Sequence, residues 1–191
     1  MKRNLLLVTL SFVSLLFASV SFASPATIKI GALFSVTGPP SFLGEPERNS
    51  AKMLVDEINA KGGVKGKKLE LIVYDTGGDA TKAVQAANRL IKEDKVVAII
   101  GPSTSGESMA VIPVAEKEGI PLISCAASSK ITDPLKKWVF KTAQNDGLAV
   151  AKIFEYLNKK KISNVAILTV SDGFGSSGRE QLKANAAKFG I

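Results

Sequence analysis

The sequence predicts an α/β fold in which parallel strands are flanked by helices. Apolar runs with strand-like spacing alternate with amphipathic helical segments from residue 27 to the end of the 191-residue chain. Residues 96–100, VVAII, form a continuous apolar run, which is typical of a strand covered on both faces. Regular alternation of strand and helix favours a parallel sheet with helices on both sides.

The strands are recognised by short apolar or alternating runs bounded by Gly, Pro, Asp or Ser. They are predicted at residues 27–34, 68–74, 96–100, 121–124, 138–141 and 164–170.

The helices are recognised by a 3.6-residue apolar period and by their start signals. The first is predicted at residues 48–60, ended by a Gly-Gly pair, and Asp79 is expected to cap the second. Capping-box spacing at residues 104–107 opens a third helix that runs to about residue 118. Asp146 is expected to cap a fourth helix, and the same spacing at residues 177–180 is expected to open the last.

The first 23 residues predict export. Lys2 and Arg3 precede an apolar run over residues 5–20, and residues 21–23, SFA, supply the small residues of a cleavage site. No Cys follows that run, so lipid attachment is not expected. The mature chain is therefore expected to be soluble and to lie outside the cytoplasm.

Composition excludes several classes of function. The formal net charge is +8, but no basic stripe with interleaved aromatics is present, so no nucleic-acid partner is expected. The chain has no His, which excludes histidine-based triads and His-ligated zinc. Cys125 is the only Cys and is read as a small core residue, while Asp75 and Asp79 are given structural roles. We therefore expect no enzyme activity, no metal and no cofactor.

One alternative comes from residues 173–178, GFGSSG. They match the G-x-G-x-x-G dinucleotide pattern between a predicted strand and a predicted helix. That reading also needs an acidic residue about 20 positions later, and the chain ends 13 residues after Gly178. A nucleotide-dependent enzyme remains an alternative on this pattern alone.

Two loops of small residues indicate a binding site. Residues 101–106, GPSTSG, join a strand to a helix start, where free backbone N–H groups and the helix dipole favour an anion. Residues 124–129, SCAASS, follow the next strand. In a parallel sheet both loops emerge at the carboxyl edge of the strands, where ligands bind. The prediction is a site for a small anionic molecule.

These loops also carry a resemblance. Segments such as IKIGALFSVTGP, INAKGGVKGKKLEL and AIIGPSTSGESMAV, with GIPLISCAASS and SDGFGSSG, resemble the Leu/Ile/Val type of periplasmic solute-binding protein of ABC transporters. The resemblance implies a type I fold of two α/β lobes that clamp a ligand between them. It places the first lobe at residues 24–143 and the start of an incomplete second lobe at residues 144–191. The chain is accordingly expected to be the N-terminal part of a longer protein.

The resemblance also implies roles for individual residues. Ser105 corresponds to the serine that holds the ligand carboxylate, with Thr104 on the same wall. Ala126 and Ser128 correspond to the pair that takes the α-ammonium group. Leu43, where relatives often carry an aromatic, and Phe174 are expected to shape the side-chain pocket.

Beyond the site, the resemblance implies an amino acid, or a related acid or amide, as ligand. It also implies a periplasmic location, an inner-membrane ABC permease as partner and a monomeric protein. The acid that pairs the ammonium group is expected beyond Ile191. A ligand-binding sensory domain of a receptor is a further alternative.

Overall fold

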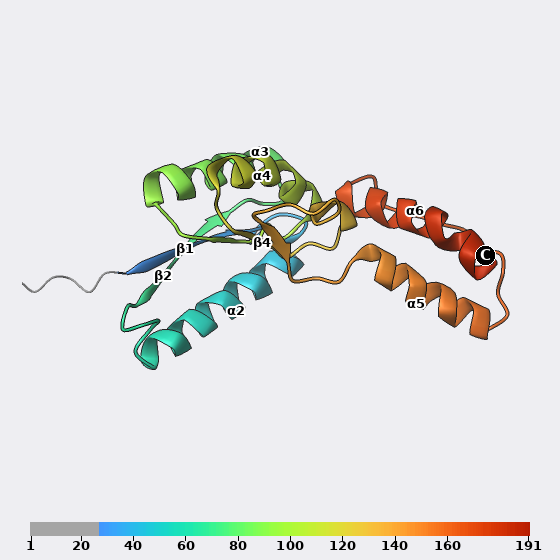
Figure 1. The fold of residues 1–191 in the computed structure, drawn as a ribbon, viewed down its shortest axis with the longest axis horizontal. Coiled ribbons are helices and arrows are strands. Elements are labelled where there is room, and N and C mark those ends of the chain that lie inside the picture. The colour runs from blue at the N-terminus through green and yellow to red at the C-terminus, as the bar shows by residue number, and fades with distance from the viewer. Residues whose placement is uncertain (1–26) are drawn as a thin grey trace, which may run out of the picture.

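Within residues 27–191, which the computed structural model describes, five parallel strands form one sheet in the order β2-β1-β3-β4-β5 (Figure 1). The predicted leader, residues 1–23, lies outside the described residues. The predicted α/β class is confirmed, since helices flank this parallel sheet. The strands are β1 (Ile28–Phe34), β2 (Leu69–Asp75), β3 (Ile99–Ile100), β4 (Leu122–Ser124) and β5 (Val139–Lys141).

Helices cover the two faces of the sheet unequally. The helix α2 (Ser41–Ala60) lies on one face, and α3 (Ala80–Arg89) and α4 (Ser105–Glu118) lie together on the other (Figure 1). A π-helical turn, η1 (Leu90–Asp94), extends α3. The main core lies between the sheet and α3 and α4, and its fully buried members are Leu33, Ala83, Ala87, Leu90, Ile99, Val111, Ala115, Leu122 and Ile131.

The C-terminal part forms a second unit beside the sheet. The helices α5 (Asp146–Lys159) and α6 (Gly173–Ala186) lie side by side and extend away from the α/β layers (Figure 1). A short 3-10 turn, η3 (Ala187–Phe189), follows α6, and the Phe154 and Phe189 rings lie 5.6 Å apart. The turn η2 (Ser129–Ile131) follows β4 and faces α6.

The predicted strand at residues 164–170 is wrong for this structure. The segment has no strand assignment, and no strand among residues 27–191 pairs with it. Leu168 is 99% exposed although the segment is apolar. A strand needs a neighbour to satisfy its N–H and C=O groups, so an apolar run alone does not produce one.

Three helix starts also differ from the prediction. The helix α2 begins at Ser41, before the predicted start at residue 48, and includes Pro46, a residue type that normally disfavours a helix interior. The N-cap of α5 is Asn145, with Asp146 already helical. The helix α6 begins at Gly173, capped by Asp172, and its start is not at Ser177.

The run at residues 96–100 is covered less completely than predicted. Val96 and Ile99 are buried, but Val97 is 55% exposed. Only Ile99–Ile100 is assigned as strand, although the Val97 N–H still donates to the Lys29 carbonyl at 2.9 Å. Val97 lies before the two residues that pair as β3, so the buried part of the run is shorter than predicted.

Candidate functional site

Buried polar side chains gather at the carboxyl edge of the sheet. Ser35 follows β1 and Ser103 follows β3, and the Ser35 N–H donates to Ser103 Oγ at 3.0 Å. Ser35 Oγ in turn donates to the Glu107 carboxylate at 2.9 Å. Glu107 on α4 is only 1% exposed, so this carboxylate links the end of β1 to the start of α4.

The predicted capping box at the start of α4 is confirmed. Thr104 Oγ1 accepts a hydrogen bond from the Glu107 N–H, and the Glu107 carboxylate accepts from the Thr104 N–H at 3.1 Å. The next two backbone N–H groups, of Ser105 and Gly106, have no hydrogen-bond acceptor among the described residues. The α4 N-terminus therefore presents two free donors at the positive end of the helix dipole.

The structure brings the two predicted loops together at this point. The Ser128 N–H donates to Ser105 Oγ at 3.2 Å, and both residues are almost completely buried. Ser128 Oγ accepts from the Lys130 N–H at 3.3 Å, which leaves its own hydroxyl hydrogen available. Ala126 is also buried, and its N–H donates to Ser124 Oγ. Thr104, Ser105, Ala126 and Ser128 thus belong to one corner of the sheet edge.

A lysine supports the second loop from β5. Lys141 Nζ donates to the carbonyls of Ala127, at 2.7 Å, and Ser128, at 3.2 Å. Burial lowers the Lys141 pKa, and the nearby Asp146 carboxylate opposes that shift. This lysine fixes the loop conformation and places a positive charge behind the corner.

Two buried oxygens lie where the chain passes from β5 into α5. Asn145 Oδ1 and Asp146 Oδ2 have no hydrogen-bond partner among residues 27–191, and Asp146 is 6% exposed. A buried carboxylate oxygen without a donor is costly, so this group calls for a partner that the described residues do not supply. Sequence reasoning assigned Asp146 only as a helix cap, because the residue type and the spacing fit that role.

The start of α6 covers the corner. A Cβ added to Gly173 would lie 3.1 Å from the Gly106 nitrogen, so the two backbones approach closely. Phe174, the next residue, is 52% exposed, and Leu43 in the first turn of α2 is 39% exposed. These two side chains are partly exposed, whereas Ser105 and Ser128 are buried.

The GFGSSG glycines have a packing explanation. A Cβ on Gly175 would lie 2.0 Å from the Val170 carbonyl oxygen, so only glycine fits where α6 begins against the preceding segment. Gly173 is needed for the approach to α4, whereas a Cβ on Gly178 meets nothing within 4 Å. These contacts account for the first two glycines of the pattern without a nucleotide.

The one cysteine, Cys125, lies near the same edge, since its N–H donates to the Pro102 carbonyl at 3.2 Å. Burial raises the Cys125 pKa to about 11, and the Glu47 carboxylate adds to that shift. Burial also raises the Glu47 pKa; a hydrogen bond from Ser103 opposes the shift, and the Glu107 charge adds to it. The Cys125 thiol is therefore mostly protonated at pH values well below about 11.

We expect Cys125 to react slowly with an aromatic disulfide reagent at pH 8. Its thiolate fraction should be about 100-fold below that of a free thiol of ordinary pKa. The urea-unfolded chain is the reference, and Glu47→Gln should react faster than the parent because one negative charge is removed. Equal rates in folded and unfolded chain would contradict this assignment.

No helix of residues 27–191 has the length and apolar character needed to span a bilayer. The same residues contain no group of three or more His, Cys, Asp or Glu side chains placed to hold a metal ion.

A parallel sheet whose carboxyl edge joins a helix N-terminus to a hydroxyl-lined loop defines an α/β ligand-binding architecture. A family model described as periplasmic binding protein matches residues 27–191. The chain belongs to this family, and the resemblance to its Leu/Ile/Val-binding type is confirmed.

Three relatives illustrate the match. The Leu/Ile/Val-binding protein BraC3 of Rhizobium johnstonii is 32% identical over 180 residues, which are 92% of this chain and 49% of the relative. The substrate-binding protein LivJ of Streptococcus pneumoniae, solved in complex with isoleucine, is 34% identical with a TM-score of 0.67, over 71% of this chain and 39% of that one.

A solute-binding protein of Rhodopseudomonas palustris BisB5, solved with 3,4-dihydroxybenzoic acid, is 26% identical with a TM-score of 0.77. The match covers 86% of this chain and 45% of that one. The chain thus spans about half the length of the relatives it matches.

Proposed function

We propose that this chain is the N-terminal part of an extracytoplasmic solute-binding protein of an ABC transporter, which captures a small carboxylate between two lobes. Residues 24–143 form the first lobe, and residues 144–191 begin the second. The observation that carries the proposal is the corner where Ser105 and Ser128 meet beside two unoccupied N–H donors of α4.

The carboxylate is held by the first lobe. The Ser105 and Gly106 N–H groups and the Ser105 hydroxyl all belong to the first turn of α4, where the helix dipole favours a negative charge. The Ser128 hydroxyl adds a donor from the opposite loop. Thr104 does not donate to the ligand, because its side chain is used in the capping box.

The ammonium group of an amino-acid ligand is held on the other side. The Ala126 carbonyl and the Ser128 hydroxyl accept hydrogen bonds from it. Asp146 supplies the negative charge, since its buried Oδ2 has no donor within the described residues. An acid of the second lobe is thus available before Ile191, in addition to any that lies beyond it.

The side-chain pocket is less restrictive than the carboxylate site. Ligands named for two relatives, isoleucine and 3,4-dihydroxybenzoic acid, share a carboxylate and differ in the rest. In this chain Leu43 and Phe174 are partly exposed, so they are available to contact the variable part. We therefore assign small carboxylates as the ligand class, with branched-chain amino acids as first candidates.

Capture proceeds without chemistry. The lobes close about the β5–α5 crossing, and the closed, ligand-loaded monomer is presented to an inner-membrane permease. Closure requires that the ligand contacts the closed state more strongly than the open state, and Asp146 and Phe174 provide that difference from the second lobe.

Ser105→Ala should weaken binding of a carboxylate about 10- to 100-fold, because a hydrogen bond to a charged group contributes about 1.5–3 kcal/mol. The fold should lose about 1 kcal/mol, since the Ser128 N–H loses its acceptor. Calorimetric titration of the intact protein with L-leucine, L-isoleucine and 3,4-dihydroxybenzoate measures the affinity.

The matched control is Ser108→Ala, which removes another fully buried hydroxyl from α4, one that bonds Ser124 Oγ at 2.7 Å. It should lower stability and leave affinity unchanged. Unchanged affinity in Ser105→Ala would remove this serine from the site.

A further inference from the structure

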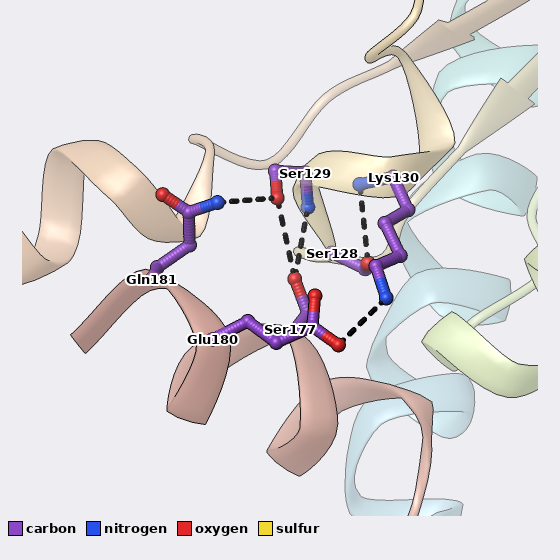
Figure 2. A network of polar contacts seen from close by, with 6 residues as sticks. All are labelled: Ser128, Ser129, Lys130, Ser177, Glu180 and Gln181. Carbon is purple, nitrogen blue, oxygen red and sulfur yellow. Dashed lines mark hydrogen bonds and ion pairs between the residues drawn. The ribbon is translucent and has the colours of Figure 1, made fainter. Parts of the chain in front are cut away.

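A polar network joins the turn after β4 to the middle of α6 (Figure 2). Lys130 Nζ lies 2.8 Å from the Glu180 carboxylate. The Ser129 N–H donates to Ser177 Oγ at 3.3 Å, and Gln181 Nε2 donates to Ser129 Oγ at 3.3 Å. The residues joined are 48 to 52 positions apart in the sequence, so the network connects the sheet unit to the helical pair.

The network is continuous with the candidate binding corner. The Lys130 N–H donates to Ser128 Oγ, so the same turn carries one end of the network and one hydroxyl of the site (Figure 2). Ser177 is 1% exposed. Its hydroxyl contacts the Ser129 hydroxyl and does not cap α6. Glu180 and Gln181 lie one helical turn further along the same face.

We propose that these five residues form an interlobe tie that favours the closed arrangement without ligand and thereby raises the affinity of the site. The tie consists of Ser129, Lys130, Ser177, Glu180 and Gln181. The inference rests on the proposed function, because it sets the opening of the same cleft. The tie residues do not contact the ligand. They bond each other between the two lobes, and the Ser105 corner stays available for the ligand.

The physical basis is the coupling of closure to affinity. When only a fraction of the molecules is in the binding-competent form, the apparent Kd is the intrinsic Kd divided by that fraction. Contacts that exist only in the closed form raise this population before the ligand arrives. The Lys130–Glu180 ion pair is half-exposed on both sides, so its contribution is modest and salt-dependent.

The test measures lobe separation in the intact protein without ligand. Spin labels at Lys61→Cys on the end of α2 and Lys183→Cys on α6 report the distance by pulsed dipolar spectroscopy. Lys130→Ala and Glu180→Ala should each lower the ratio of closed to open molecules about 2- to 5-fold. The double variant should lower it no further than either single variant, because both remove the same pair.

Three comparisons sharpen this test. The exchanged pair, Lys130→Glu with Glu180→Lys, should restore most of the closed population. Raising NaCl from about 50 to 500 mM should open the parent and leave the double variant unchanged. The matched control is Lys152→Ala, which removes the 2.7 Å pair with Glu155 inside α5 and should not change the separation.

An unchanged distance distribution in both single variants, or single effects that simply add, would overturn the tie. This readout uses no ligand, so it is independent of whether the protein binds a carboxylate. If the tie is present, the affinity of a carboxylate that binds the parent should fall by the same factor as the closed population.

Discussion

Gly101→Ala should lower the free energy of unfolding by about 4 kcal/mol or more, the largest loss of any substitution considered. Positive-φ strain costs about 1–3 kcal/mol, and a backbone clash adds to that cost. Gly101 has φ +95° between β3 and α4, and an added Cβ would lie 2.2 Å from the Leu33 carbonyl oxygen. Relief requires that β1 or the start of α4 moves, which would also displace Ser105. Urea unfolding followed by circular dichroism measures the loss.

Gly62→Ala is the matched control for this prediction. Gly62 has φ +97°, almost the same as Gly101, but an added Cβ meets nothing within 4 Å. It should therefore cost only the backbone strain, about 1–2 kcal/mol. If Gly101→Ala were no more destabilising than Gly62→Ala, the close approach to β1 would not determine the position of the loop.

Glu107→Ala should have the second-largest effect, lowering the free energy of unfolding by about 3 kcal/mol. The carboxylate accepts hydrogen bonds from Ser35 Oγ, the Thr104 N–H and Thr104 Oγ1, and its removal leaves buried donors unsatisfied. It also removes half of the capping box, a contribution of about 1 kcal/mol. Because α4 begins here, binding at Ser105 should weaken as well.

The control is Glu118→Ala at the other end of α4, where the carboxylate only approaches Lys92 Nζ at 3.9 Å. It should change stability by less than about 0.5 kcal/mol. Glu107→Gln should lie between parent and Glu107→Ala, since the amide oxygen still accepts. A loss below about 1 kcal/mol for Glu107→Ala would show that the buried cluster does not hold α4.

Local signals in the sequence were enough to predict much of the fold and the corner where Ser105 and Ser128 meet. The capping box at Thr104 and Glu107 is a short-range pattern, and the structure forms it as predicted. The loops of Ser105 and Ser128 follow neighbouring parallel strands, so their approach follows from sheet topology. Each of these features depends on contacts that are local or fixed by the order of the strands.

Features that depend on partners distant in the sequence were missed. The apolar segment at residues 164–170 has strand-like composition, but pairing depends on a neighbour and not on composition. Ser177 resembles a cap in sequence, yet its hydroxyl accepts a hydrogen bond from the Ser129 N–H in the turn after β4, while Asp172 caps α6. Asp146 was predicted as a helix cap, but it lies one residue inside α5, and its burial and unpartnered oxygen depend on surroundings that no local pattern reveals.

The central claim is that the Ser105 corner binds the carboxylate of a small solute. The most direct measurement is a calorimetric and thermal-shift comparison of small carboxylates, amino acids included, with their matched amides and NADH, on the intact protein and on Ser105→Ala. We predict that at least one carboxylate binds and raises the melting temperature, that its amide binds more weakly, and that Ser105→Ala removes most of the difference. Stabilisation by NADH with none by any carboxylate, or equal binding of acid and amide by parent and variant, would contradict the account.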